Sequence, residues 1–366
     1  MNDLEAYVTL NAAVTLPKNR VAKLLEKFGT AQAIFAAPPR AWVGPDMLTH
    51  HLAERLDEAR RTFRVDEELR RAEAVGLRVM TRDDADYPQN LREIFDPPCV
   101  LYVKGTLEPE DTNAVAVVGS RNASYYGLAC SRDFAARLAS FGLTVVSGMA
   151  RGIDTAAHRA ALDAGGRTFA VLGSGFMDIY PCENMGLCEE IAANGAVLSE
   201  FALDTAPLAQ NFPVRNRIVS GLSRGVLVVE ASLKSGALIT ARLAAEQGRE
   251  VFAIPGKLSS ETSAGAHDLI KHGAHMVTSA EEILHEIGPA LRLDIGRACP
   301  APRRPAGVPL SEEEERLFAV LDDEPKHIDT ICRESATDPA RASALLLQME
   351  LKAAVRQVAG RKFIVA

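Results

Sequence analysis

Short runs of apolar, often β-branched residues alternate with alanine-rich stretches from about residue 77 to residue 287. Segments 115–118 and 226–229 are apolar at every position. A strand has this composition when both of its faces are buried, which is typical of a parallel sheet covered by helices. The alanine-rich stretches, such as 131–141 and 240–247, have the length of helices that connect parallel strands. The pattern therefore predicts an α/β fold with a doubly wound, mostly parallel sheet.

Nine segments are predicted as strands of this sheet, and we expect the first two to enlarge it at one edge. They are residues 77–81, 100–103, 115–118, 144–147, 168–172, 196–198, 226–230, 250–254 and 275–277.

The regions before and after this sheet domain differ from it in composition and predicted secondary structure. Residues 1–75 are predicted as a helical N-terminal domain, in which segment 48–74 is a long charged helix or a helix pair. Residues 294–309 are rich in proline and are predicted as an extended linker, because proline interrupts both helix and central strand. Residues 310–366 are predicted as three helices followed by a hairpin, which is a winged-helix arrangement. The sheet domain then spans residues 76–293.

Composition excludes several classes of protein. The net charge of −7 argues against a histone-like coat on DNA, although it leaves a local basic groove open. No stretch approaches the roughly 18 apolar residues of a membrane span, and acids stand where a signal peptide carries Lys or Arg. The six cysteines are scattered, without metal-binding spacing. We therefore expect a reduced, cytoplasmic chain without membrane insertion, structural zinc or a bound cofactor.

Four predicted strands end in loops that are rich in Gly and Ser, and three of these loops also carry Arg or Lys. Glycine lets the backbone approach a ligand, serine adds a hydroxyl, and the basic side chains add charge, so together they predict a phosphate-binding rim. Any one such glycine is more often part of a tight turn, and the first loop lacks the spacing of a dinucleotide fingerprint. The candidate residues are Gly119, Ser120, Arg121, Gly148, Arg151, Gly152, Gly173, Ser174, Lys234, Ser235 and Gly236.

The densest basic signal lies in segment 211–224, which holds three arginines, no acid and an aromatic residue near its start. Guanidinium groups match phosphate oxygens in pairs, and an aromatic ring can stack on a base, as in single-strand binding. The alternative is an arginine that packs and pairs inside the fold, which is plausible for one of Arg215 and Arg217. The candidates here are Phe212, Arg215, Asn216 and Arg217.

Two acidic positions leave alternatives open. Asp154 and His158 share a helix face and form either an acid–base pair or, as we favour, a structural cap and a buried histidine. Glu230 follows a strand and is either a catalytic acid or a partner of Arg217 or Lys234. His275 has no carboxylate at ligand spacing along the chain, and we predict no metal site there.

Four of these segments are recognisable. Residues 117–121, 146–158, 212–218 and 234–240 resemble the DNA-processing protein A (Smf) family, with the resemblance most specific between about 77 and 287. It implies an extended Rossmann core that binds single-stranded DNA, an N-terminal domain of sterile-alpha-motif type and a C-terminal winged helix. It also implies a homodimer that protects incoming DNA and helps load the RecA recombinase during natural transformation, rather than an enzyme.

The sequence departs from the family pattern in three places. The N-terminal region around residues 16–20 lacks the glycine-containing hairpin of a helix–hairpin–helix DNA contact. Some relatives carry a DNA-holding lysine where Cys182 and Glu183 stand here, and the last helix of the C-terminal domain is poor in basic residues. Two other functions remain open. One is a phosphoribohydrolase-like enzyme acting on a nucleotide, although its glycine-rich loop is missing before Glu230. The other is a sensor of a free nucleotide.

Overall fold

The computed structural model describes residues 1–13, 18–288, 310–321, 325–352, 354–358 and 360–365. The predicted linker 294–309 lies outside the described residues. Within them, no helix combines the length and the hydrophobicity needed to cross a bilayer. The five cysteines of the described segments, at positions 99, 130, 182, 188 and 332, form no disulfide bond with one another.

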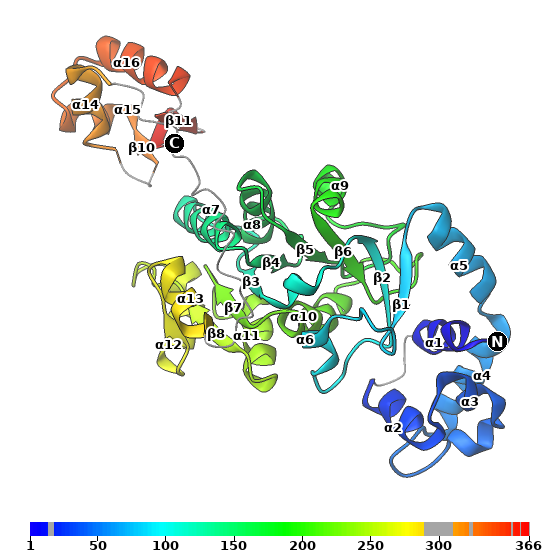
Figure 1. The fold of residues 1–366 in the computed structure, drawn as a ribbon. Helices are drawn as coiled ribbons and strands as arrows, with labels where there is room; N and C mark the ends of the chain where they lie inside the picture. The colour runs from blue at the N-terminus through cyan, green and yellow to red at the C-terminus, as the bar shows by residue number, and fades with distance from the viewer. Residues whose placement is uncertain (14–17, 289–309, 322–324, 353, 359, 366) are drawn as a thin grey trace.

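A sheet of nine strands forms the centre of the molecule, in the order β1-β2-β6-β5-β4-β3-β7-β8-β9 (Figure 1). Strands β3 to β9 pair in parallel, whereas β2 is antiparallel to both β1 and β6. All nine predicted strands are confirmed to within two residues at each end, and the first two do extend one edge. Their bounds are Arg78–Thr81, Val100–Gly105, Ala114–Val118, Thr144–Ser147, Thr168–Val171, Gly195–Ser199, Gly225–Val228, Glu250–Ala253 and His275–Met276.

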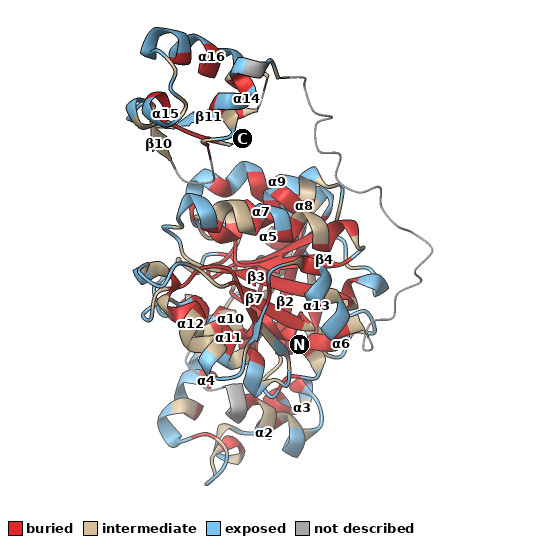
Figure 2. Cartoon of the chain, turned by 90° about the vertical axis from the view of Figure 1, so that its left-hand side faces the viewer, coloured by how far each residue is buried: buried red, intermediate tan, exposed pale blue. Residues whose placement is uncertain are grey.

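Helices cover both faces of the sheet, and Figure 2 shows the strands as the buried centre between them. Val115 and Val117 of β3 belong to the hydrophobic cluster that includes residues of α7, α8 and α13, while Ala116 and Val118 belong to the cluster on the other face, which includes residues of α10 and α11. This alternation explains why β3 is apolar at every position. The helices of this region are α6 (Gln89–Arg92), α7 (Tyr125–Ser140), α8 (Ile153–Asp163), α9 (Met185–Ala193), α10 (Asn211–Gly221), α11 (Ala237–Glu246), α12 (Ala264–Lys271) and α13 (Ala280–Ile287).

The N-terminal helices share a hydrophobic core with the edge of the sheet, to which Val100 and Tyr102 of β2 contribute. A buried carboxylate joins the two parts, because Glu68 of α5 accepts hydrogen bonds from the Tyr102 hydroxyl at 2.9 Å and from the Leu203 amide at 2.8 Å. Segment 48–74 contains a pair of helices, not one. The bounds are α1 (Asp3–Ala12), α2 (Lys18–Phe28), α3 (Ala31–Ala36), α4 (His50–Thr62) and α5 (Val65–Ala74).

The C-terminal residues fold as three helices and a three-stranded sheet in the order β10-β12-β11. Leu317, Ile331, Leu346 and Phe363 are among the residues of their separate hydrophobic core. This is the predicted winged-helix arrangement. Its elements are α14 (Glu312–Phe318), β10 (Lys326–His327), α15 (Ile328–Glu334), α16 (Pro339–Leu351), β11 (Val355–Val358) and β12 (Lys362–Val365).

Candidate functional site

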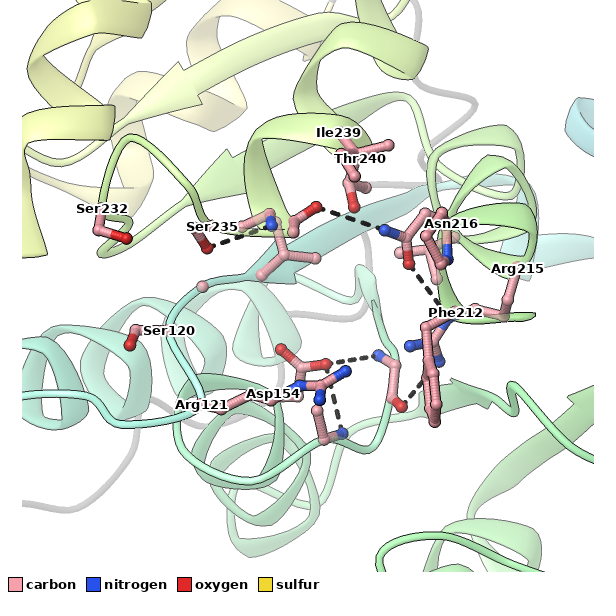
Figure 3. Close-up of a pocket in the computed structure, with 18 of the residues that line it drawn as sticks. Ser120, Arg121, Asp154, Phe212, Arg215, Asn216, Ser232, Ser235, Ile239 and Thr240 are labelled. Carbon is pink, nitrogen blue, oxygen red and sulfur yellow. Dashed lines mark hydrogen bonds between the residues drawn. The ribbon is translucent and has the colours of Figure 1, made fainter. Parts of the chain in front are cut away.

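A cavity of about 410 Å³ opens at the carboxyl ends of β3, β4 and β7 (Figure 3). The neighbours of β3 in the sheet are β4 and β7, so the direction of winding reverses here. Ligands of doubly wound sheets bind at such a reversal. Nine predicted residues line the cavity, namely Gly119, Ser120, Arg121, Gly148, Phe212, Arg215, Asn216, Ser235 and Gly236.

Arg121 supplies the accessible positive charge of the cavity. Its side chain is exposed, and its guanidinium carbon lies 5.1 Å from the centre of the Phe212 ring. Within the described segments, no carboxylate pairs with it. The cation–aromatic contact holds the guanidinium at the cavity mouth while its N–H groups stay free to bind an anion.

Arg215 lines the same cavity, and two of its three guanidinium nitrogens, Nε and Nη1, donate to the protein. Nη1 donates to the Gly148 carbonyl at 2.7 Å and to the Val171 carbonyl, so the side chain ties the end of β4 to the end of β5. Burial lowers its pKa to about 10, although the nearby Asp154 carboxylate opposes this shift. Gly148 is required for this contact, because a Cβ there would lie 2.5 Å from Nη2 of Arg215.

Asp154 and His158 do not form an acid–base pair. Asp154 accepts the Gly148 amide at 3.1 Å and the Ala150 amide at 3.4 Å, and burial raises its pKa. His158 is fully buried, with Nδ1 2.7 Å from the Thr168 hydroxyl. That hydroxyl donates to a backbone carbonyl, so Nδ1 carries the ring proton. Burial, assisted by the charge of Arg215, lowers the His158 pKa to about 3. The histidine is therefore neutral and structural.

Arg217 lies away from the cavity, in a buried ion pair. Its guanidinium contacts the Glu200 carboxylate at 2.6 Å and the Asp96 carboxylate at 2.9 Å. Burial alone would lower its pKa, but the two carboxylates raise it. The expectation that Arg217 contacts a ligand is corrected by this placement, because its donors are satisfied inside the fold. Both Arg215 and Arg217 therefore make contacts inside the fold, and of the two only Arg215 also lines the cavity.

The Glu230 carboxylate is hydrogen-bonded at the start of α7. It accepts the Ser124 amide at 2.9 Å and the Ser124 hydroxyl at 3.1 Å, and it also accepts the Thr262 hydroxyl. Ser124 is the N-cap of α7, so the carboxylate fixes the beginning of that helix. It contacts neither Arg217 nor Lys234. A catalytic acid needs a proton position open to substrate, which this buried carboxylate lacks.

A strip of alternating basic and aromatic side chains extends from the cavity. The Arg121 guanidinium stacks on Phe212, the Phe212 and Tyr180 rings meet edge to face at 5.9 Å, and the Arg151 guanidinium lies 5.7 Å from the Tyr180 ring centre. We call Arg121, Phe212, Tyr180 and Arg151 the cation–aromatic strip. Sequence reasoning missed Tyr180, which lies on a long loop between β5 and α9 and carries no local signal.

Arg151 is exposed but paired, since Nη2 lies 2.9 Å from Oε2 of Glu183. The pair raises the pKa of Arg151 and lowers that of Glu183. Lys234 is also exposed, on the loop after β7, and no described residue pairs with it. Neither lines the cavity.

The other predicted glycines and Ser174 serve the walls of the site. The Phe212 ring occupies the space beside Gly173, where a Cβ would lie 2.7 Å from the ring. Gly152 has a φ of +75° and packs against the carbonyl of Ser120, and Ser174 is buried. The residues that line the cavity without having been predicted include Asn122, Asp154, Ser232 and Thr240.

One group of potential metal ligands lies elsewhere, at the far edge of the sheet. Ligand atoms of Glu250, His275 and Glu286 lie within 4.8 Å of one another, and all three side chains are exposed. The two carboxylates are distant from His275 along the chain, so the absence of a carboxylate at ligand spacing in the sequence did not reveal this contact in space. This group lies at the edge strand β9, away from the cavity at the carboxyl ends of β3, β4 and β7.

The chain is similar to proteins of one known family. The family model of DNA recombination-mediator protein A matches residues 78–288, and that of the DprA winged helix domain matches residues 301–361. Protein Smf of Escherichia coli is 43% identical over 283 residues, covering 76% of this chain and 75% of the relative. Protein Smf of Synechocystis is 34% identical and 93% of each chain is covered.

Solved structures show the same similarity. DNA processing protein A of Streptococcus pneumoniae superposes with a TM-score of 0.68 at 36% identity, over 78% of this chain and 98% of that one. The Helicobacter pylori protein, described for its single-stranded DNA binding mode, superposes with a TM-score of 0.53 at 31% identity, over 58% and 97%. The match of the family model to most of the sheet region and the identity with full-length relatives lead to one conclusion: the chain belongs to the DNA recombination-mediator protein A family.

Proposed function

We propose that the protein binds single-stranded DNA along the cation–aromatic strip and the cavity beside it. The strip carries the proposal, because it places the exposed Tyr180 ring and the partly exposed Phe212 ring next to Arg121, whose guanidinium has no carboxylate partner among the described residues and can bind a phosphate. Aromatic stacking tolerates any base, so binding has little sequence preference. Bases of a duplex are already stacked on one another, which favours single strands over duplex at this site.

The cavity supports phosphate binding through hydroxyl groups as well. The Ser120 hydroxyl accepts the Asn122 amide at 3.2 Å, and the Ser235 hydroxyl accepts the Ala237 amide at 3.3 Å. Each hydroxyl proton therefore remains available to a phosphate oxygen. The proposed contacts are the lining residues Gly119, Ser120, Arg121, Gly148, Phe212, Arg215, Asn216, Ser235 and Gly236, with Arg151, Tyr180 and Lys234 beside them.

The protein is a binding protein of a recombination-mediator family and not an enzyme. The phosphoribohydrolase alternative depended on Glu230, whose carboxylate is used by Ser124 and Thr262. We further propose that the protein acts in the cytoplasm as a homodimer that protects incoming strands and helps load the RecA recombinase during transformation. The division into domains at residues 75, 293 and 309 is part of the same proposal, supported by the two family models.

Titration of the purified protein with labelled single-stranded and duplex oligonucleotides of equal length over a salt series tests DNA binding. We expect tighter binding to the single strand. The logarithm of its binding constant should fall by about 0.7 per neutralised phosphate for each tenfold increase in salt concentration. A free nucleoside monophosphate should compete only weakly, which separates this function from a nucleotide sensor. Equal affinity for the duplex, in the protein truncated before residue 310, would overturn the proposal.

A separate measurement tests the role in recombination. RecA hydrolysis of ATP on a strand already coated by single-strand-binding protein should start sooner when the protein is present. An unchanged lag would remove the loading function and leave the binding function intact.

A further inference from the structure

The third helix of the C-terminal domain is poorly suited to contact DNA. Nε of Arg341 lies 3.0 Å from Oε2 of Glu313, and Nζ of Lys352 lies 2.7 Å from Oε2 of Glu314, so Arg341 of α16 and Lys352 at its C-cap are neutralised within the domain. In helix-turn-helix proteins the beginning of this helix meets the base edges. Here Asp338 caps it, accepting the Ala340 and Arg341 amides, and places a negative charge where a phosphate would approach.

The hairpin that follows has the opposite character. Arg356, Arg361 and Lys362 are exposed, and none of them has a hydrogen bond or ion pair to a described residue. Segment 355–365 contains no acidic residue. The nearest acid along the chain, Glu350, accepts the Gln357 amide of the hairpin backbone at 2.9 Å and leaves these three charges unpaired.

The register of the hairpin places two of these charges on one face. Arg356 pairs with Ile364 and Val358 pairs with Lys362 across the two strands. Residues opposite each other share a face, and so do residues two apart on one strand, so Arg356 and Lys362 point the same way. Val355 and Phe363 point the other way and are buried in the core of the domain. Arg361 lies in the turn, where its φ is +55°.

We propose that this hairpin, which we call the wing (residues 355–365), binds the phosphate backbone of duplex DNA. Guanidinium groups pair with phosphate oxygens, and a two-stranded ribbon can approach either groove of a duplex. The wing offers no ring to stack on an unpaired base, because its one aromatic residue, Phe363, is buried. This distinguishes it from the cation–aromatic strip. The inference goes beyond the proposed function, which concerns single strands at the cavity.

The test compares two charge-matched variants of the full chain. Arg356→Gln/Lys362→Gln removes two charges from the wing. Arg316→Gln/Arg333→Gln removes two exposed charges from α14 and α15 of the same domain, which have no ion pair with a described residue. Arg361 stays, because its backbone conformation complicates a substitution. Affinity for a duplex is measured by fluorescence anisotropy over a salt series, and affinity for a single strand is measured in parallel.

We expect the wing variant to lose about tenfold in duplex affinity and to reduce the salt slope by about 1.8, which corresponds to two phosphates at 0.9 each. The control variant should stay within about twofold, and single-strand affinity should change by a few-fold at most in both. Equal losses in the two variants would overturn the proposal, since net charge would then explain them. So would unchanged duplex affinity in the wing variant, or no duplex binding by the parent protein at low salt.

A polyglutamate peptide serves as the remaining probe. Two results together would overturn the DNA assignment: the peptide binds the parent protein but not the wing variant, and the wing variant binds duplex as tightly as the parent. The surface would then recognise an acidic protein. Loss of single-strand binding in Arg121→Ala, tested separately, concerns the proposed function and does not affect this result.

Discussion

Arg217 and Glu200 form an ion pair in the interior of the protein, with 2.6 Å between Nη2 and Oε2 and with only 5% and 1% of their side chains exposed. Asp96 contacts the same guanidinium from the segment between β1 and β2. The pair therefore joins α10 to the loop after β6 and to the edge of the sheet. A buried charge is stable only while its partners remain in place.

Arg217→Ala should therefore destabilise the fold instead of removing a DNA contact. Loss of Arg217 removes the guanidinium that faces the buried Glu200 carboxylate, and breaking a buried ion pair in this way typically costs about 3–5 kcal/mol. Urea unfolding followed by circular dichroism measures the change. Replacing Glu200 together with Arg217 by methionine should restore part of the loss, because neither charge of this buried pair is then left without the other. An Arg217→Ala protein of parental stability with weakened DNA binding would contradict this interpretation.

Arg121→Ala should weaken single-strand binding without affecting stability. Its guanidinium is exposed and has no carboxylate partner among the described residues, so the side chain holds no part of the fold together. Loss of a charged hydrogen bond to phosphate costs about 1.5–3 kcal/mol, or roughly ten- to a hundredfold in affinity. Arg159→Ala is the matched control, because Arg159 is an exposed, unpaired arginine on α8 that does not line the cavity. Similar losses in both would show that only net charge matters.

The sheet could be read from the sequence because its signal is local. Strand β3 is apolar at all five positions and β7 at all but its first, Gly225, and helices cover both faces of each. The loops at the strand ends were also recognised, because Gly, Ser and Arg occur there together. Their approximate meeting at one edge follows from the parallel topology alone.

The individual roles of the arginines could not be read in this way. Arg215 and Arg217 are two residues apart on one helix, yet one reaches the cavity and the other meets Glu200 and Asp96. Asp96 lies 121 residues from Arg217 along the chain, so no local pattern marks the pair. The same holds for Tyr180, which joins the strip only through the folded path of its loop, and for the carboxylates around His275.

Glu183→Gln should strengthen single-strand binding. Glu183 pairs with Arg151 at the end of the cation–aromatic strip and competes there with DNA phosphate. Without the carboxylate, Arg151 keeps its stacking on Tyr180 and becomes free to bind phosphate, so we expect a few-fold higher affinity at low salt. Glu189→Gln is the control, because it breaks a comparable surface ion pair with Lys104 on another part of the molecule. An equal gain in the control would mean that the effect is one of net charge.

His158→Gln should make the protein less sensitive to acid. The pKa of His158 is about 3 in the folded state, against 6.5 for a free histidine, so the unfolded chain binds a proton that the folded protein excludes. The stability that the folded protein gains by keeping His158 neutral is thus fully present above pH 6.5, and it is lost progressively as the pH falls toward 3. Between pH 7.5 and pH 5 the parent should lose about 2 kcal/mol more than the variant. Asp154 titrates in both proteins, so the difference isolates the histidine. Parallel stability curves would contradict the prediction.

Truncation after Ile295 should leave single-strand binding within a few-fold of the full chain. The cavity and the strip are built from residues 118–240, and the described residues of the C-terminal domain have a hydrophobic core of their own that includes no residue of the nine-stranded sheet. Its removal therefore exposes no part of the core that buries β3 and β7. The wing can add weak contacts to the same strand, which accounts for a small avidity effect. Duplex affinity should fall much further than single-strand affinity, since the wing is lost while the strip remains. Anisotropy titrations of both chains with the same two oligonucleotides measure the difference. A single-strand loss beyond tenfold, about 1.4 kcal/mol, would instead place a main contact for the strand in the C-terminal domain.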